Sequence, residues 1–259
     1  MEVRGEKIAI AYGPKTIVPE MDITVKKGEI TTIIGPNGSG KSTILKALTR
    51  LLPYKKGCIY LGKETIENIA TKKFAQTIGV LPQQHFVPPN FKVKELVGFG
   101  RVPYQKWHEK NSPHDEEIID WALKATGTWE LRDKTLQQCS GGEAQRVWIA
   151  AVLAQEPDIL FLDEPTTFLD IAHQQETMQL VKKLNRQSGM GVVMVLHELS
   201  QALEVSDRIV VIKDGKKYSE GTPLEVITAK MMWEVYHVEC QIVHIPGRTK
   251  PIIAYKEIS

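Results

Sequence analysis

A glycine-rich segment at residues 35–43, with the sequence GPNGSGKST, constrains the fold of this chain more than any other stretch. An apolar, β-branched run at residues 30–34 precedes it, and residues 44–50 with helical spacing follow it. The order is therefore strand, glycine loop, helix. In such a loop, backbone N–H groups surround phosphate groups, and glycines allow the tight turns and the close approach to an anion. An accidental glycine-rich turn is the weaker interpretation, because both flanks fit.

The end of this segment carries the side chains that a bound nucleotide requires. Lys41 is placed to reach the β- and γ-phosphate oxygens, and the Ser42 hydroxyl is placed to bind Mg²⁺. The predicted nucleotide site includes every residue of the segment, namely Gly35, Pro36, Asn37, Gly38, Ser39, Gly40, Lys41, Ser42 and Thr43.

Composition argues against several other classes of protein. The chain has 259 residues, a net charge of +2 and 25% charged residues, so we expect one large domain with no strong field that attracts nucleic acid. Three cysteines without CxxC spacing indicate a reducing compartment. The N-terminus lacks a signal-peptide pattern, and the longest apolar runs are too short to cross a bilayer. We therefore expect a cytosolic chain, and any membrane-spanning helices would belong to a partner.

Apolar runs in the second half of the chain predict an α/β fold. Strands are expected at residues 159–162, 192–196 and 209–212, and helices at residues 171–185 and 199–205 lie between them. Buried strands that alternate with helices are typical of a parallel sheet covered on both faces.

The first half of the chain predicts two further substructures. Residues 3–12 and 22–25 alternate like antiparallel strands around a Gly-Pro turn, whereas residues 84–154 have mainly helical spacing. The predicted organisation is a single domain over residues 1–259, with a nucleotide-binding core at 1–83 and 155–259 and a helical insertion at 84–154.

Polar residues that follow buried strands supply the remaining chemistry. Asp163 and Glu164 follow one such strand, and His197 follows the next. Open parallel sheets bind ligands at the carboxyl ends of their strands, so these side chains should meet the glycine loop. A carboxylate there can orient and deprotonate an attacking water. A helix cap or turn is the alternative for the acidic pair, and a capping or packing role is the alternative for His197; Gln83 is a weak signal by itself.

The ordered set of motifs resembles the ATP-binding cassette (ABC) ATPases over essentially the whole chain. The matching segments are GPNGSGKST for Walker A, LPQQ with Gln83 for the Q-loop, CSGGEAQ for the signature, ILFLDEP for Walker B, Leu169-Asp170 for the D-loop and VLHE with His197 for the switch histidine. The resemblance implies an ATPase with a P-loop NTPase (RecA-like) core and parallel sheet, an N-terminal antiparallel β subdomain and an inserted α-helical subdomain. It also implies ATP and Mg²⁺ as cofactors.

The resemblance assigns a role to each matching residue on the near side of the nucleotide. Lys41, Ser42 and Thr43 would hold the phosphates and, together with Asp163, Mg²⁺. Gln83 would contact Mg²⁺ and water, and would respond to a membrane partner.

Catalysis and adenine binding follow from the same resemblance. Glu164 would be the general base, and His197 would sense the γ-phosphate. Tyr12 falls where the family stacks an aromatic side chain on adenine, and Asp170 belongs to the D-loop.

The signature segment would bind the ATP held by a second copy in a head-to-tail dimer. Its residues are Ser140, Gly141, Gly142 and Glu143. A helix start of this kind offers N–H groups and a positive dipole end to an anion, and a chain that already has a phosphate loop needs another anion site if two chains share a nucleotide. An ordinary N-cap is the alternative. The motif departs from the family pattern at Cys139, usually Leu, and at Glu143, usually Gln, which places a carboxylate near the shared site.

Three other segments carry a narrower resemblance. TTFLDIAHQ (166–174), GRVPY (100–104) and EGTPLEVIT near the C-terminus resemble ATPase subunits of importers for ferric siderophores, haem and cobalamin. The resemblance implies a peripheral subunit on the cytoplasmic face of the membrane that energises import of an iron chelate. An integral membrane permease would dock near residues 85–90, and an extracellular substrate-binding protein would be an indirect partner. Import of cobalamin or a metal ion is the alternative.

Two rival functions and one rival site are less compatible with the sequence. Long coiled coils or tandem cassettes would support a soluble ABC ATPase that acts on DNA or in translation, but the chain has one phosphate loop. A module that holds ATP without hydrolysis would not need Glu164 and His197. The motif HVECQIVH suggests a metal site, but in an extended strand Cys240 and His244 would lie roughly 13 Å apart.

Overall fold

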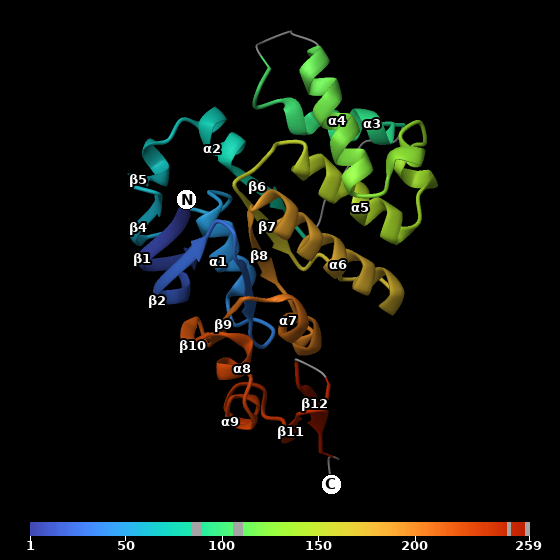
Figure 1. Cartoon of the computed structure of the whole chain (residues 1–259). Coiled ribbons are helices and arrows are strands. Elements are labelled where there is room, and N and C mark those ends of the chain that lie inside the picture. The colour runs from blue at the N-terminus through green and yellow to red at the C-terminus, as the bar shows by residue number, and fades with distance from the viewer. Residues whose placement is uncertain (84–89, 106–110, 248–249, 257–259) are drawn as a thin grey trace.

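Figure 1 shows the computed structural model of the chain, which describes residues 1–83, 90–105, 111–247 and 250–256. Most of the predicted permease contact, residues 85–89, lies outside the described residues. Within the described ranges, every helix is too short or too polar to span a bilayer.

A six-stranded sheet forms the centre of the molecule, in the order β10-β9-β3-β8-β7-β6. Five of these strands run parallel, and β10 pairs antiparallel with β9. The bounds are β3 (Ile30–Ile34), β6 (Ile78–Leu81), β7 (Ile159–Asp163), β8 (Gly191–Val195), β9 (Arg208–Lys213) and β10 (Lys216–Gly221). The predicted α/β class with a parallel sheet is confirmed. Because β3, β8 and β7 are neighbours, their carboxyl ends lie side by side.

Side chains that alternate along the strands supply two hydrophobic cores, one on each face of the sheet. On β8, Val192 and Met194 belong to one core, whereas Val193 and Val195 belong to the other. The first core includes residues of α5 (Gly141–Leu153), α6 (Ile171–Ser188) and α7 (Leu199–Val205), and the second includes residues of α1 (Lys41–Leu48). The sheet is therefore covered on both faces, which explains why its strands are continuous apolar runs.

The N-terminal strands form a separate four-stranded sheet in the order β2-β1-β4-β5. Its strands are β1 (Glu2–Tyr12), β2 (Lys15–Lys26), β4 (Lys56–Leu61) and β5 (Glu64–Thr65). The structure extends the strand expected at 22–25 back to Lys15, because β2 pairs with β1 from Glu2↔Lys26 to Tyr12↔Lys15. The first part of β2 has pairs of adjacent exposed residues, and its register with β1 shifts, so the sequence there lacks the alternation of buried and exposed residues that predicts a strand.

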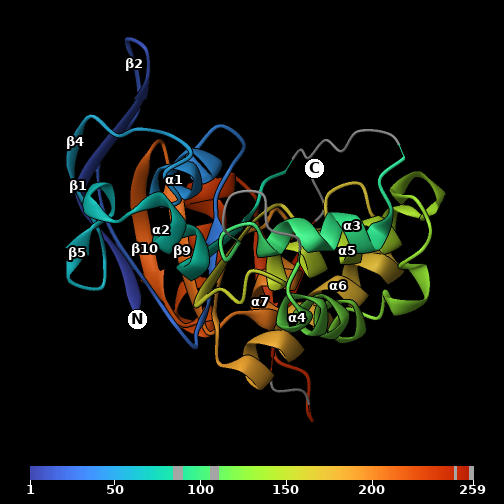
Figure 2. The same ribbon diagram turned by 90° about the horizontal axis from the view of Figure 1, so that it is seen from above.

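A group of helices lies on the other side of the molecule from β1, β2 and β4, as Figure 2 shows. It contains α3 (Val93–Gly98), α4 (Pro113–Ala125) and α5, which contribute to one core through residues such as Val97, Ile119 and Val147. The helical character expected for this part of the chain is present. The domain boundaries at 84 and 154 stay a prediction.

The GRVPY segment has a structural role that the sequence does not reveal. Arg101 is 1% exposed, and its Nε donates to Asp115 Oδ1 at 2.8 Å. Its guanidinium also donates to the Ala154 carbonyl and to Glu156 Oε2, both at 2.8 Å. A Cβ on Gly100 would lie 2.3 Å from the Ala151 carbonyl oxygen, so only glycine fits there. The segment joins the start of α4 to the end of α5.

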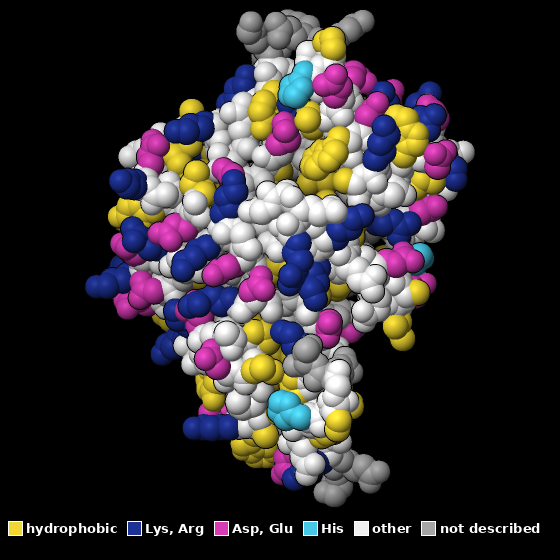
Figure 3. Space-filling view, in the orientation of Figure 1, with side chains coloured by type: hydrophobic (Ala, Val, Ile, Leu, Met, Phe, Trp, Pro, Cys, Tyr) yellow, Lys and Arg dark blue, Asp and Glu magenta, His cyan; other side chains and the backbone are white. Residues whose placement is uncertain are grey.

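Short elements complete the chain. They are α2 (Thr71–Thr77), α8 (Pro223–Val226), α9 (Ala229–Met231), η1 (Ile66–Asn68), η2 (Phe99–Arg101), η3 (Trp129–Leu131), η4 (Leu136–Gln138), η5 (Met232–Tyr236), β11 (Cys240–Val243) and β12 (Ile252–Tyr255). The space-filling view in Figure 3 shows basic and acidic side chains interspersed over this face, which fits the small net charge of the chain.

Candidate functional site

The phosphate loop connects β3 to α1, and its backbone requires glycine at two positions. Gly35 has φ +152°, and a Cβ there would lie 2.1 Å from the Ile212 carbonyl oxygen of β9. Gly40 has φ +101° and is the N-cap of α1. The glycines therefore hold the loop against β9 and turn it into the helix, as the sequence predicts.

The loop contains groups that suit an anion. No side chain caps the first turn of α1, which leaves the N-terminal end of the helix dipole open to a ligand. The buried Ser39 hydroxyl has no hydrogen-bond partner. A pocket of about 300 Å³ opens over the loop, and its lining residues include Lys41, Ser42, Glu164 and His197. A nucleotide phosphate fits these open donors.

Lys41 is held within the loop. Its Nζ donates to the carbonyl oxygens of Gly35 and Pro36, both at 2.9 Å. Burial lowers the pKa of Lys41, and the nearby Glu164 and Asp163 carboxylates oppose that shift. The ammonium group is thus positioned at the loop, where an incoming phosphate can replace the carbonyls as its partner.

Asp163 stands at the carboxyl end of β7, next to the loop. Ser42 Oγ donates to Asp163 Oδ1 at 2.8 Å. Burial raises the pKa of Asp163, and the hydrogen bond from Ser42 opposes the shift. The hydroxyl and the carboxylate predicted to bind Mg²⁺ therefore lie together.

Glu164 is the centre of a cluster that joins three strand ends. His197 Nε2 lies 2.5 Å from Glu164 Oε1, and Gln83 Nε2 donates to Glu164 Oε2 at 2.6 Å. Thr167 Oγ1 also donates to Glu164 Oε2, at 3.1 Å. Glu164 has φ +55°, a conformation that few non-glycine residues adopt and that is often found at functional sites. The structure thus brings Gln83, Glu164 and His197 together.

Two contacts of this site do not follow from the sequence motifs. Thr167 contacts Glu164, and Tyr236 of η5 lies close to the backbone of Gly35 in the phosphate loop. Burial raises the pKa of Tyr236. The second threonine of EPTT is a local signal that could have identified Thr167, whereas Tyr236 is about 200 residues from the loop in sequence, and no local pattern connects them.

The signature segment lies apart from this pocket. Among the described residues, the pocket lining includes none of Ser140–Glu143, and Tyr12 is also outside it, with 46% of its surface exposed. Ser140 caps α5: Glu143 N donates to Ser140 Oγ at 3.2 Å, and Ser140 N donates to Glu143 Oε2 at 2.7 Å. That backbone hydrogen bond lowers the pKa of Glu143. The contact of Glu143, open at the level of sequence, is therefore the N-cap of its own helix.

Asp170 has the corresponding position at the start of α6. Its Oδ1 accepts a hydrogen bond from His173 N at 2.9 Å. The His173 ring packs against Gly142 of the signature segment, where an added Cβ would lie 2.5 Å from His173 Cγ. Phe168 and Ile171 flank Asp170 with exposed fractions of 96% and 79%. The signature and D-loop segments thus meet beside an exposed apolar surface.

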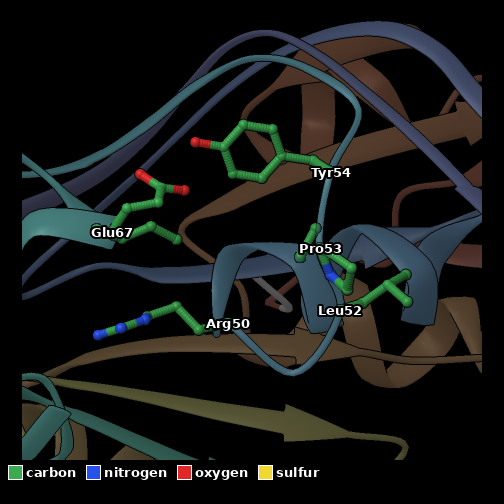
Figure 4. Close-up of a pocket in the computed structure, with 7 residues that line it drawn as sticks. Arg50, Leu52, Pro53, Tyr54 and Glu67 are labelled. Atoms are coloured by element: carbon green, nitrogen blue, oxygen red, sulfur yellow. The ribbon is translucent and has the colours of Figure 1, made fainter.

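A separate pocket of about 450 Å³ lies at the other end of α1, and Figure 4 shows the residues that line it. Tyr54 points its hydroxyl towards Glu67, and burial together with this carboxylate raises the pKa of Tyr54 to about 12. Arg50 donates to the Ile69 carbonyl at 3.0 Å. None of the predicted site residues lines this pocket, so it is distinct from the phosphate site.

Known proteins share this sequence and fold. A family model described as "ABC transporter" matches residues 18–167. The chain is 42% identical to the iron(3+)-hydroxamate import ATP-binding protein FhuC of Bacillus subtilis, over 95% of this chain and 92% of that protein. It is 43% identical to the petrobactin import ATP-binding protein FpuC of Bacillus anthracis, over 98% and 92% respectively.

A solved structure extends the similarity to the fold. It is the dimeric, post-hydrolysis state of an ATP-binding cassette with ADP and Pi bound, with 29% identity, a TM-score of 0.73 and coverage of 85% of this chain and 98% of that chain. The family model matches more than half of the chain, and the relatives match almost all of it. The chain therefore belongs to the ABC transporter family and is one of its ATPases.

Proposed function

We propose that this ATPase is the subunit that energises import of an iron chelate of the siderophore type through a membrane permease. The observation that carries the proposal is the similarity, at 42% and 43% identity over nearly the full length, to two proteins named for import of iron(3+)-hydroxamate and petrobactin. The cluster of Glu164, His197 and Gln83 beside the phosphate loop supports ATP hydrolysis as the energy source.

In the proposed mechanism, the phosphate loop holds ATP. The uncapped N-terminus of α1 and the Lys41 ammonium bind the phosphates, and the Ser39 hydroxyl gains a partner. Ser42, Asp163 and Gln83 would hold Mg²⁺, which supplies charge neutralisation on the phosphate oxygens. Hydroxyl, carboxylate and amide oxygens suit this hard cation.

Glu164 is the proposed general base. Its carboxylate accepts hydrogen bonds from Gln83 and Thr167 and contacts His197, so its orientation is fixed before a nucleotide binds. A carboxylate held in this way can take a proton from a water that attacks the γ-phosphate. His197, exposed at the pocket, would then contact the γ-phosphate.

A second copy would complete the site. Ser140 and Gly141 are exposed at the start of α5, beside the exposed Phe168 and Ile171. Apolar side chains with this exposure are typical of protein interfaces. In a head-to-tail dimer the signature segment of one copy would lie against the phosphates held by the other, and Asp170 would lie at the interface.

The helical group around α3 offers a surface for the permease. A hollow of about 770 Å³ beside α3 is lined by residues that include Phe91 and Phe99, and Val102 at its edge is 55% exposed. Glu95, Gln105, Asn111 and Glu116 also line this hollow, and Phe91 places its edge close in sequence to residues 85–89. A cytoplasmic helix of a permease, presented at the membrane surface, would cover it.

Reconstitution tests the proposal. The chain is co-expressed with a candidate permease and assembled in liposomes with the matching substrate-binding protein, and ATP-dependent uptake of ⁵⁵Fe-hydroxamate is compared with uptake of cobalamin and free iron. Uptake of the iron chelate alone supports the proposal. Uptake of cobalamin or of free iron would show that the proposed substrate is wrong. ATP hydrolysis that no permease affects would favour a soluble ABC ATPase.

A further inference from the structure

Gln201 is a buried glutamine of α7 where three parts of the molecule meet. Only 4% of the surface of Gln201 is exposed. Its Oε1 accepts a hydrogen bond from Thr166 Oγ1 at 3.2 Å. Its Nε2 donates to Gln174 Oε1 and to Glu198 Oε2, both at 2.9 Å. The amide therefore uses both donors and its acceptor on three different segments.

One side of this network leads to the D-loop. Gln174 donates through Nε2 to the carbonyl oxygens of Thr166 at 3.4 Å and Leu169 at 3.1 Å. Leu169 immediately precedes Asp170, which caps α6. Gln201 and Gln174 together therefore hold the turn that presents Asp170 and the exposed Phe168.

The other side leads to the catalytic cluster. Glu198 follows His197 directly, and His197 contacts Glu164. Gln201 donates to the side chain of Glu198, which is the N-cap of α7, so this hydrogen bond lies in the turn that directly follows His197. Gln201 and Gln174 both hydrogen-bond to Thr166, which lies two residues after Glu164. The network therefore contacts the turn that carries the proposed base.

The chemistry of the partners selects glutamine at this position. The carboxylate of Glu198 is acceptor-only, so the amide nitrogen has to face it, and Oε1 then faces the Thr166 hydroxyl. A glutamate at this position would set two carboxylates against each other. A leucine of similar size would fill the space and donate nothing.

We propose that Gln201 is a positioning residue that couples the D-loop turn to the His197 turn, so that a partner copy that contacts Asp170 sets the geometry of the hydrolytic cluster. This coupling rests on the proposed roles of Glu164 and His197. The described lining of the phosphate pocket does not include Gln201. Its effect is on the rate of hydrolysis after ATP has bound.

The test compares Gln201→Leu with Gln175→Leu, a matched change at an exposed glutamine of α6. Steady-state hydrolysis, ATP affinity and thermal unfolding are measured on the full-length chain. We expect Gln201→Leu to lower kcat by about 10- to 100-fold with ATP affinity within about twofold of wild type, since small misplacements of catalytic groups have effects of this size. Gln175→Leu should match wild type in all three.

A double variant separates positioning from stability. Gln174→Leu with Gln201→Leu removes both partners of the hydrogen bond between α6 and α7, so the double variant should lose less thermal stability than the two single variants added together. Under the proposal its kcat stays at least as low as that of Gln201→Leu. A kcat near wild type in the double variant, or an unchanged kcat in Gln201→Leu, overturns the proposal. A Glu164→Gln variant that still hydrolyses ATP would instead refute the proposed base, whatever Gln201 does.

Discussion

Two helices of this molecule have glycine at their N-terminal ends, Gly40 just before α1 and Gly141 in the first turn of α5, but only one of them has a side-chain cap. At α1 the N-cap is Gly40, which has no side chain to offer, and a buried Ser39 hydroxyl beside it lacks a partner. At α5 the N-cap is Ser140, and a complete capping box joins it to Glu143. Both helix ends attract anions through the same backbone dipoles. The N-terminal end of α1 is open to an anion at the phosphate loop of its own chain. The N-terminal end of α5 is already stabilised by its capping box, without an anion.

This difference separates the two halves of the proposed site. The loop before α1 offers Lys41 and an uncapped helix end to phosphates, and Asp163, Glu164 and His197 lie around it within the same chain. The start of α5 is exposed and lies beside Asp170 instead. We infer that the α1 end decides affinity for ATP and the α5 end decides whether two copies close on it. Single substitutions in each half can test that division.

The largest effect should come from the base within the α1 half. Glu164→Gln keeps a side chain that can accept hydrogen bonds but removes the group that takes the proton, so hydrolysis should fall by at least about 100-fold. ATP binding should persist, and a stable ATP-bound dimer should be visible by size-exclusion chromatography with light scattering. Glu117→Gln, at an exposed glutamate of α4, is the control. Normal turnover in Glu164→Gln would remove Glu164 from catalysis.

Lys41→Ala, a change in the α1 half, should lower the affinity of the chain for ATP. Loss of a charged partner of the phosphates removes about 2 kcal/mol or more, equivalent to roughly 30-fold weaker ATP binding. The control is Lys183→Ala, at an exposed lysine of α6. Binding of a fluorescent ATP analogue to the isolated chain gives both constants. Equal affinities would show that Lys41 does not hold the phosphates.

Sequence motifs predict the α1 half well because its geometry is local. The order of strand, glycine loop and helix is contiguous, and the strand ends that carry Asp163 and His197 are unambiguous apolar runs. Motifs are weaker where the chain returns from a distance. Neither the contact of Tyr236 with Gly35 nor the hydrogen bonds of Gln201 follow a periodic pattern, because they depend on how α7 and η5 pack against the sheet.

Ser140→Ala should affect the α5 half and leave the α1 half intact. Loss of the N-cap should lower the free energy of unfolding by about 1 kcal/mol. ATP affinity of the isolated chain should stay the same, while ATP-dependent dimerisation of the Glu164→Gln background should weaken. Ser188→Ala, at the far end of α6, controls for loss of a serine hydroxyl. Weaker ATP binding by the isolated chain would mean that the two halves are not separate.

The smallest effect should come from Glu143, where this chain departs from the usual residue of its motif. Glu143→Gln keeps the capping box, because a glutamine at this position can still accept the hydrogen bond from Ser140 N. It removes a negative charge from the helix end that would approach the partner's ATP, and a charge at a helix terminus is worth about 0.3–1 kcal/mol. In the Glu164→Gln background we therefore expect ATP-driven dimerisation to tighten by up to about fivefold, with more effect at low salt than at high salt. Unchanged or weaker dimerisation, measured by analytical ultracentrifugation at two salt concentrations, would show that Glu143 acts only as a cap and that the α5 end does not face an anion.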